Sequence, residues 1–227
     1  VYSDLNFIDL TTGLKDNYRG IEPGSETGDA VPNQFLLGWA SWITGTPALG
    51  GVGLGYIFAQ GRFAYFAYDD PTFVLANFLP SKSNNEIYTL LNAPNAEPST
   101  DLSAFKQRGG KLIIYNGWLD PFVAPRATID YYQMIKQSTR ASEENFMRLF
   151  LMPGLGHCGF GPGPQIFDGP AVLENWVEHG QAPDSITAFN RSFSMNRPIC
   201  PYPKTAKLID SSANANESSN WTCQDNE

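Results

Sequence analysis

The stretch Lys111-Leu-Ile-Ile-Tyr-Asn-Gly-Trp-Leu-Asp-Pro-Phe-Val-Ala-Pro125 decides the fold of this chain. Its first five residues form an apolar run with branched side chains that begins directly after Gly109-Gly110. Such a run is typical of a strand covered on both faces, as in a parallel sheet that lies between helices. We therefore expect a buried strand over 111–115 and a loop over 116–125.

A helix and a second strand follow this loop. Residues 126–137 place Ile129, Tyr132 and Ile135 on one side of a helix, and residues 147–152 form a second apolar run. This succession predicts a strand-helix-strand unit with parallel strands. Further helices are expected at 71–78, at 85–92, at 101–108 after an N-cap at Ser99 or Thr100, and at 170–179 before Gly180.

Two parallel strands are not a stable sheet, because faces and edges stay open. We therefore predict an α/β protein that is the C-terminal part of a larger sheet domain, whose remaining strands come from a missing N-terminal part of the same precursor. The start at Val1, without the basic and apolar segments of a signal peptide, indicates the first residue of a processed product.

The first 70 residues lack this alternation of strands and helices and are expected to form part of an irregular lid or cap. Leu36–Ala59 is uncharged and long enough for a bilayer, but six glycines and Pro47 favour a buried, loop-rich region. Aromatic residues here could bind an aromatic ligand, although core packing is their commoner use. They are Phe35, Trp39, Trp42, Tyr56, Phe58, Phe63, Tyr65, Phe66 and Tyr68.

Charge, cysteines and sequons bear on partners and compartment. The net charge of -8, without a Lys/Arg cluster, argues against nucleic-acid binding. Three sequons, at Asn190, Asn216 and Asn220, lie in a polar tail with Cys200 and Cys223, which favours secretion. With Cys158 the cysteine count is odd, so one thiol is free or is bonded to another chain. We expect 71–185 to be the α/β part and 186–227 a disulfide-pinned, glycosylated tail.

Two polar residues follow the predicted strands. Asp120 lies in the loop after the first strand, and His157 lies in the glycine-rich loop 153–164 after the second. The carboxyl ends of parallel strands carry the catalytic groups of open α/β sheets, so these side chains should meet. A histidine that acts as a base needs a carboxylate on its other nitrogen, and Asp120 is placed to supply it.

The chain order Asp, then His, matches an α/β-hydrolase that lacks its serine. No serine lies in Gly-x-Ser-x-Gly, so the nucleophile is expected outside this chain. Simpler readings remain open, because Asp120 before Pro121 could begin a turn and His157 could be an ordinary loop histidine. The chain has only two histidines, and one of them falls in the loop that a hydrolase requires.

Several motifs resemble one known family. Tyr115-Asn-Gly-Trp-x-Asp-Pro121 and Leu151-Met-Pro-Gly-Leu-Gly-His-Cys158 are similar to the last two catalytic loops of the tannase and feruloyl esterase family. Glu174-Asn-Trp-Val-Glu178 and Pro23-Gly-Ser-Glu26 fit the same family, and the likeness extends from about residue 20 to residue 200. The resemblance implies an α/β-hydrolase fold with a lid.

The same resemblance implies a covalent partner. In the family, the cysteine after the catalytic histidine is bonded to a cysteine beside the nucleophilic serine, and here that position is Cys158. Cys158 would then link this chain to an N-terminal chain of the same precursor, leaving Cys200 and Cys223 to pair with each other. The family also implies a structural calcium, bound mainly by the missing chain; no catalytic cofactor and no metal site on this chain are expected.

These observations predict one subunit of a secreted serine esterase that acts on small phenolic esters. Galloyl esters of tannins are the favoured substrates, and feruloyl esters of plant cell walls are the alternative. A secreted carbohydrate- or phenol-binding module is the non-enzyme alternative, and it predicts that His157 is dispensable. No membrane partner is expected.

Overall fold

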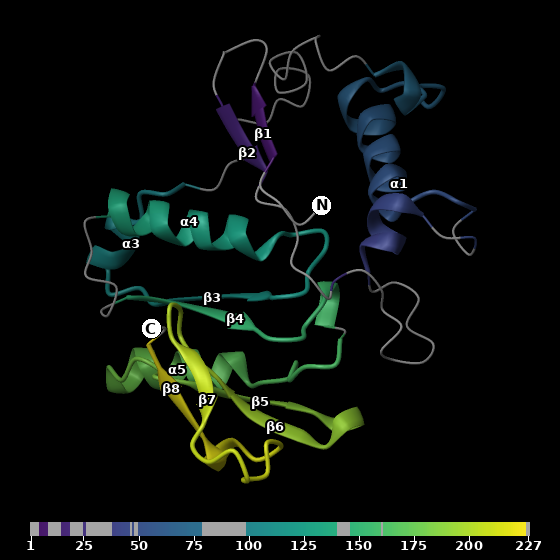
Figure 1. The fold of residues 1–227 in the computed structure, drawn as a ribbon. Coiled ribbons are helices and arrows are strands. Elements are labelled where there is room, and N and C mark those ends of the chain that lie inside the picture. The colour runs from purple at the N-terminus through teal and green to yellow at the C-terminus, as the bar shows by residue number, and fades with distance from the viewer. Residues whose placement is uncertain are drawn as a thin grey trace.

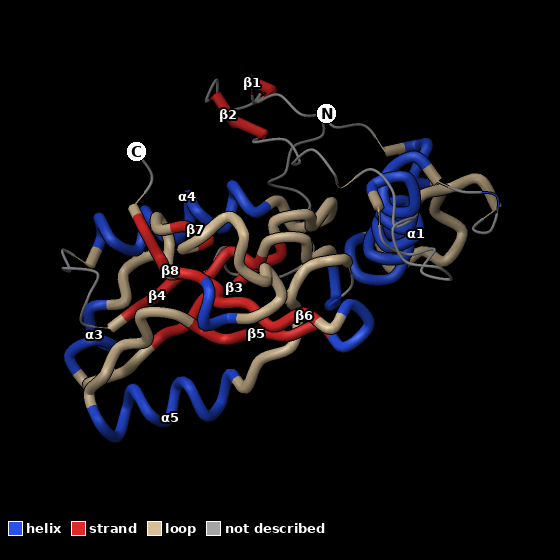
Figure 2. Tube along the Cα trace, turned by 60° about the horizontal axis from the view of Figure 1, so that its bottom comes forward, coloured by secondary structure: helices blue, strands red, loops and turns tan. Residues whose placement is uncertain are grey.

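The computed structural model describes residues 5–8, 15–18, 25, 38–45, 47, 50–78, 99–139, 146–159 and 161–225. A layered α/β body occupies the second half of the chain, with strands in the middle and helices on either side (Figures 1 and 2). The helical segment around α1 lies beside this body, at the end of the sheet where the strand β3 leads into its loop (Figure 1).

The expected strand-helix-strand unit is present. Strand β3 (Leu112–Gly117), helix α4 (Pro125–Ser138) and strand β4 (Met147–Met152) follow one another, and β3 pairs with β4 in parallel. The register runs from Leu112 opposite Met147 to Gly117 opposite Met152, so both strands end at the same level. Strand β3 continues two residues beyond the predicted end, which places Asn116 inside the strand.

Alternate side chains of β4 serve two cores, one on each face. Met147 and Leu149 pack with Tyr132 and Ile135 of α4, and all four are almost fully buried. Phe150 and Met152 point to the other face and join a second cluster that includes Ile186, Ala188 and Ile199. Burial of both faces explains why this strand reads as a continuous apolar run.

The second face is covered by α5 (Gly169–His179), which lies on the side of the sheet opposite α4 (Figures 1 and 2). Asp168 caps α5 by accepting a hydrogen bond from Ala171 N at 3.0 Å, and Gly180 ends it with a positive φ of 69°. The expected helix over 170–179 is therefore confirmed.

Residues 186–225 are more ordered than the expected polar tail. Strands β5 (Ile186–Asn190) and β6 (Met195–Ile199) form one antiparallel pair, joined by the turn η7 (Arg191–Phe193), and β7 (Thr205–Leu208) and β8 (Trp221–Gln224) form another. The turn η8 (Ser218–Asn220) precedes β8. Cys200 and Cys223 are disulfide-bonded with their Cα atoms 5.6 Å apart, which ties the second pair to the end of β6.

The predicted lid, residues 1–70, is also more regular than expected in the parts that the structure describes. It contains an antiparallel pair, β1 (Leu5–Ile8) with β2 (Lys15–Tyr18), the π-helical turn η1 (Ala40–Thr44), helix α1 (Leu54–Gly61) and the π-helical turn η3 (Arg62–Ala67). The uncharged stretch over 36–59 therefore ends in a short helix. No helix among the described residues is long and apolar enough to cross a membrane.

Two helix predictions need correction. The expected helix over 71–78 is only a turn of 3-10 helix, η4 (Leu75–Asn77). The side-chain amide of Gln60 donates a hydrogen bond to Phe73 O and accepts one from Leu75 N at 2.7 Å. These two backbone groups are therefore not available for the hydrogen bonds of a helix over 71–78. Helix α3 (Ser103–Gln107) lies within the expected helix over 101–108. We expected Ser99 or Thr100 to cap it, but the carboxylate that accepts from Ser103 N, at 3.0 Å, is that of Asp101.

The expected helix over 85–92 lies outside the described residues. The domain limits near residues 70 and 185 stay predictions.

Candidate active site

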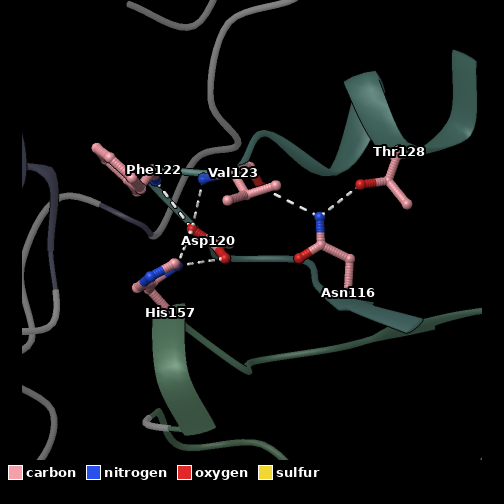
Figure 3. A network of polar contacts seen from close by, with 6 residues as sticks. All are labelled: Asn116, Asp120, Phe122, Val123, Thr128 and His157. Carbon is pink, nitrogen blue, oxygen red and sulfur yellow. Dashed lines mark hydrogen bonds and ion pairs between the residues drawn. The ribbon is translucent and has the colours of Figure 1, made fainter. Parts of the chain in front are cut away.

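Asp120 and His157 meet beyond the ends of β3 and β4. The Nδ1 atom of His157 lies 2.9 Å from Oδ2 and 3.1 Å from Oδ1 of Asp120 (Figure 3). The side chain of Asp120 is 7% exposed and that of His157 is 20% exposed. A carboxylate on Nδ1 fixes the imidazole tautomer and leaves Nε2 to exchange a proton with a reacting group.

Close contact between the two loops brings these side chains together. Trp118 N donates to Met152 O and Leu119 N donates to Leu155 O, each at 2.9 Å. Gly117 allows this approach, because a Cβ atom there would lie 2.4 Å from Leu155 O. The parallel register of β3 and β4, together with these contacts, therefore fixes the distance between the loops that carry Asp120 and His157.

The carboxylate of Asp120 is itself held in place. Its Oδ1 accepts hydrogen bonds from Phe122 N at 2.9 Å and from Val123 N at 2.8 Å (Figure 3). These bonds fold the loop around the carboxylate and orient Oδ2 toward the imidazole. The turn-forming use of Asp120 before Pro121 and its contact with His157 therefore coexist.

Asn116 braces the same loop, a role that sequence reasoning missed. Its amide nitrogen donates to Val123 O at 3.1 Å and to Thr128 Oγ1 at 2.9 Å, so it links the end of β3 to the start of α4 (Figure 3). A polar residue at the end of a buried strand was the available signal, since buried amides are hydrogen-bonded.

Aromatic rings from the lid and from the Asp120 loop surround the imidazole. The ring centroids of Trp42 and His157 lie 4.6 Å apart at 73°, and those of Phe122 and His157 lie 5.5 Å apart. Trp42 also contacts Phe122, with centroids 4.7 Å apart, and is itself 8% exposed. No local sequence signal pointed to Trp42 in particular, because more than a hundred residues separate it from His157.

We expected the aromatic residues of the predicted lid to fill a core, and this expectation is wrong for several of them. Five side chains are at least two fifths exposed, whereas the buried residues of α1 and η3 are the small Ala64 and Ala67. The five are Tyr56, Phe58, Tyr65, Phe66 and Tyr68. Phe35 lies outside the described residues.

A cleft of about 950 Å³ opens beside the pair. Asp120 and His157 lie on its wall, which continues along β3 through Ile113 and Tyr115 toward Phe167. Tyr115 is 58% exposed although it belongs to strand β3 of the α/β unit. In the part of the chain that the structure describes, β3 pairs with β4 alone, so its other edge borders this cleft.

The remaining predicted site residues fall in three places. Cys158 lies in the turn η6 (His157–Gly159), but its side chain is outside what is described, so its bond to another chain stays a prediction. Cys200 and Cys223 are paired as expected. Asn216 and Asn220 are partly exposed near β8, and their glycosylation stays a prediction.

Asn190, the third predicted glycosylation site, is buried. It is only 1% exposed, and its amide nitrogen lies 2.8 Å from Gly163 O. A glycan must be attached to this same nitrogen and needs open space around it. The folded protein offers no such space.

Asp70, an acidic residue of the predicted lid, uses its carboxylate within its own turn. The carboxylate of Asp70 accepts from both Thr72 N and Thr72 Oγ1, and these hydrogen bonds hold the pKa of Asp70 below its ordinary value. Among the described residues, no group of three or more His, Cys, Asp or Glu could hold a metal ion. A calcium ion held by another chain stays a prediction.

Comparison with known proteins places this site in context. The model of the family described as tannase and feruloyl esterase matches residues 1–224. Mono(2-hydroxyethyl) terephthalate hydrolase of Piscinibacter sakaiensis is 40% identical over 55% of this chain and 21% of its own length. Feruloyl esterase B of Aspergillus niger is 30% identical over 54% of this chain and 27% of its own length.

Solved structures share the fold at lower identity. An esterase from Aspergillus oryzae superposes with a TM-score of 0.71 and 20% identity, covering 99% of this chain and 44% of that structure. Tannin acyl hydrolase from Aspergillus niger gives a TM-score of 0.64 and 20% identity, over 97% of this chain and 41% of that structure. The chain thus has an α/β-hydrolase-like fold and spans less than half of the length of these relatives.

Proposed function

Since this chain belongs to the tannase and feruloyl esterase family, we propose that it is the C-terminal part of a serine esterase that hydrolyses esters of phenolic acids. Asp120 and His157 are the acid and base of its Ser-His-Asp triad. The contact of His157 Nδ1 with both carboxylate oxygens of Asp120, at 2.9 and 3.1 Å, carries this proposal.

The reaction is acyl transfer to water. The serine hydroxyl attacks the ester carbonyl while Nε2 of His157 takes its proton, and the imidazolium then returns that proton to the leaving alcohol. Water hydrolyses the acyl-enzyme in the same way, with His157 again as the base. Asp120 stabilises the imidazolium formed in both steps.

The serine belongs to a segment that precedes this chain. Three observations support this: the chain has no Gly-x-Ser-x-Gly motif, it spans less than half of its relatives, and the edge of β3 borders the cleft beside His157. The preceding segment would continue the sheet at β3 and fill part of the cleft. A disulfide from Cys158 would hold the serine near His157, because bonded cysteines have Cα atoms within about 7 Å.

The aromatic surroundings of His157 favour an acyl group whose ring is attached directly to the carbonyl. Trp42 and Phe122 contact the imidazole itself, so a ring that packs against them would lie next to the reacting carbonyl. Galloyl esters have this geometry, and so has the terephthalate ester in the name of one relative. Galloyl esters are therefore our first choice of substrate.

Feruloyl esters are the second choice. Their ring is two carbons further from the carbonyl, and it would reach the exposed Phe58, whose ring centroid lies 6.1 Å from that of Trp42. Feruloyl esterase B of Aspergillus niger, at 30% identity, supports this alternative. The Cys200–Cys223 disulfide and the sequons at Asn216 and Asn220 support secretion of the protein.

A comparison of two esters with one variant tests the function. The complete protein, with its preceding segment, should hydrolyse methyl gallate faster than methyl ferulate, and His157→Ala should lower kcat by orders of magnitude while the protein stays folded. Conversion of His179→Ala, at the end of α5, is the matched control and should leave kcat unchanged. Near-normal turnover by the His157 variant would refute the catalytic role of His157, and a complete unchanged protein that hydrolyses neither ester would instead support a binding module.

A further inference from the structure

Asn190 occupies a position that its sequon does not explain. It is the last residue of β5 and is followed by the exposed Ser192, so Asn190-Arg-Ser192 reads as a glycosylation site. The side chain is nevertheless 1% exposed. Any further chain packed on this one could only lower that exposure, so the burial does not depend on the missing segment.

The amide of Asn190 is fully used inside the protein. Its nitrogen donates to Gly163 O at 2.8 Å and to Gly161 O at 3.3 Å, and its oxygen accepts from Ser192 N at 3.1 Å. The two glycine carbonyls belong to the loop that carries His157. An amide nitrogen has two protons, and each can serve one of these carbonyls.

The loop over 153–164 has two limbs with His157 between them. The outgoing limb is held by Leu119 N, which donates to Leu155 O at 2.9 Å. The return limb folds back so that Gly163 N donates to Gly154 O at 3.0 Å. The contact between limbs is close, because a Cβ atom on Gly163 would lie 1.8 Å from Pro153 O.

Strand β5 anchors the end of the return limb. Ile166 and Phe189 exchange two backbone hydrogen bonds, at 3.0 and 2.9 Å, and Asn190 follows Phe189 directly. The outgoing limb is therefore fixed by the Asp120 loop, and the return limb is fixed by β5 and the Asn190 amide. His157 is held between these two attachments.

We propose that Asn190 is a positioning residue that holds the return limb of the His157 loop, and that its sequon carries no glycan. This inference rests on the proposed function only for its catalytic consequence. Asn190 acts through the carbonyls of Gly161 and Gly163, which set the path of the loop and so the place of the imidazole beside Asp120.

Two variants separate the amide from the sequon. Asn190→Asp keeps the shape of the side chain but turns an oxygen toward Gly161 O and Gly163 O, so both hydrogen bonds are lost. Ser192→Ala destroys the sequon but keeps the Ser192 backbone N–H and the whole Asn190 side chain. Both are made in the complete protein, secreted from a host that glycosylates, together with the unchanged protein.

The measurements are kcat and KM for methyl gallate per folded molecule, hydrogen exchange of the backbone amides over 153–164, and glycopeptide mass. Asn190→Asp should lower kcat by about 10- to 100-fold with KM little changed, since a small displacement of a catalytic group has that cost. Exchange in the loop should be about tenfold faster or more. Ser192→Ala should match the unchanged protein in all three measurements.

Several results would overturn the inference. A glycan on Asn190 in the unchanged protein refutes it directly, and so does an equal loss of kcat in Ser192→Ala. Unchanged loop exchange and unchanged kcat in folded Asn190→Asp would show that the amide positions nothing. If Asn190→Asp fails to fold, the glycopeptide mass and the Ser192→Ala variant decide. If the unchanged protein lacks esterase activity, the proposed function fails, while hydrogen exchange over 153–164 and glycopeptide mass still test the role of Asn190.

Discussion

Replacing Asp120 by Asn should move the imidazole proton of His157 from Nδ1 to Nε2 without altering the fold. Oδ1 of Asp120 accepts from Phe122 N at 2.9 Å and from Val123 N at 2.8 Å. An amide nitrogen cannot accept these bonds, so the oxygen of the asparagine must take this position. Its NH₂ group then takes the place of Oδ2, 2.9 Å from His157 Nδ1.

The consequence is the wrong imidazole tautomer. Because the NH₂ group donates and lies at the nearer position, 2.9 Å against 3.1 Å for the oxygen, Nδ1 should become the acceptor. The proton then moves to Nε2, which can no longer accept the serine proton. In a Ser-His-Asp enzyme this exchange lowers kcat by about 10⁴-fold, or about 5 kcal/mol in the barrier. Stability should change little, since the side chain keeps its shape and both backbone hydrogen bonds.

The assay is kcat for methyl gallate in the complete protein, with thermal unfolding of the same samples. Asp184→Asn makes the same change of charge at an exposed position and should leave kcat unaffected. A kcat for Asp120→Asn within tenfold of the unchanged protein, with the fold intact, would refute the assigned role. A large fall in Tm would instead point to a structural use of the carboxylate.

Four further predictions concern Cys158, the missing nucleophile, the Cys200–Cys223 disulfide and Trp42. Peptide mapping without reduction should find Cys158 bonded to a cysteine beside a serine in the preceding segment, and a free thiol in active protein contradicts this. This chain expressed alone should not hydrolyse methyl gallate, because it has no nucleophile; turnover by the pure chain would be a contrary result. Cys200→Ser with Cys223→Ser should lower the free energy of unfolding by about 3 kcal/mol, which denaturant titration measures, and an unchanged midpoint would count against it. Trp42→Ala should lower kcat/KM for methyl gallate about tenfold but leave an acetyl ester less affected, so an equal loss for both esters would exclude Trp42 from the acyl pocket.

The sequence was most informative where burial imposes a simple pattern. Strand β4 is buried on both faces and β3 is partly buried beside it, so their apolar runs predicted both strands and also placed Asp120 and His157 at their ends. The expected helix over 71–78 failed for the opposite reason. There, the side chain of Gln60, which belongs to helix α1, hydrogen-bonds backbone groups of Phe73 and Leu75. The sequence pattern within 71–78 gives no sign of this contact, because Gln60 lies outside that segment.

The site shows the same division. The types and spacing of Asp120 and His157 could be predicted, because the chemistry of a general base requires them in these loops. Asn116 had only a weak local signal. Trp42 was one of nine lid aromatics and could not be distinguished from the others, because only the folded chain brings it to His157.

The amino-acid sequence by itself determined the parallel strand-helix-strand unit, the order of Asp120 and His157, and the likeness to a family. Each of these depends on residue type and short spacing. Tertiary structure alone decided that Asp120 and His157 lie 2.9 Å apart, that Trp42 covers the imidazole, and that Asn190 is buried. These facts depend on contacts between segments far apart in the chain, where a sequon or an aromatic residue reads the same whether folding buries or exposes it.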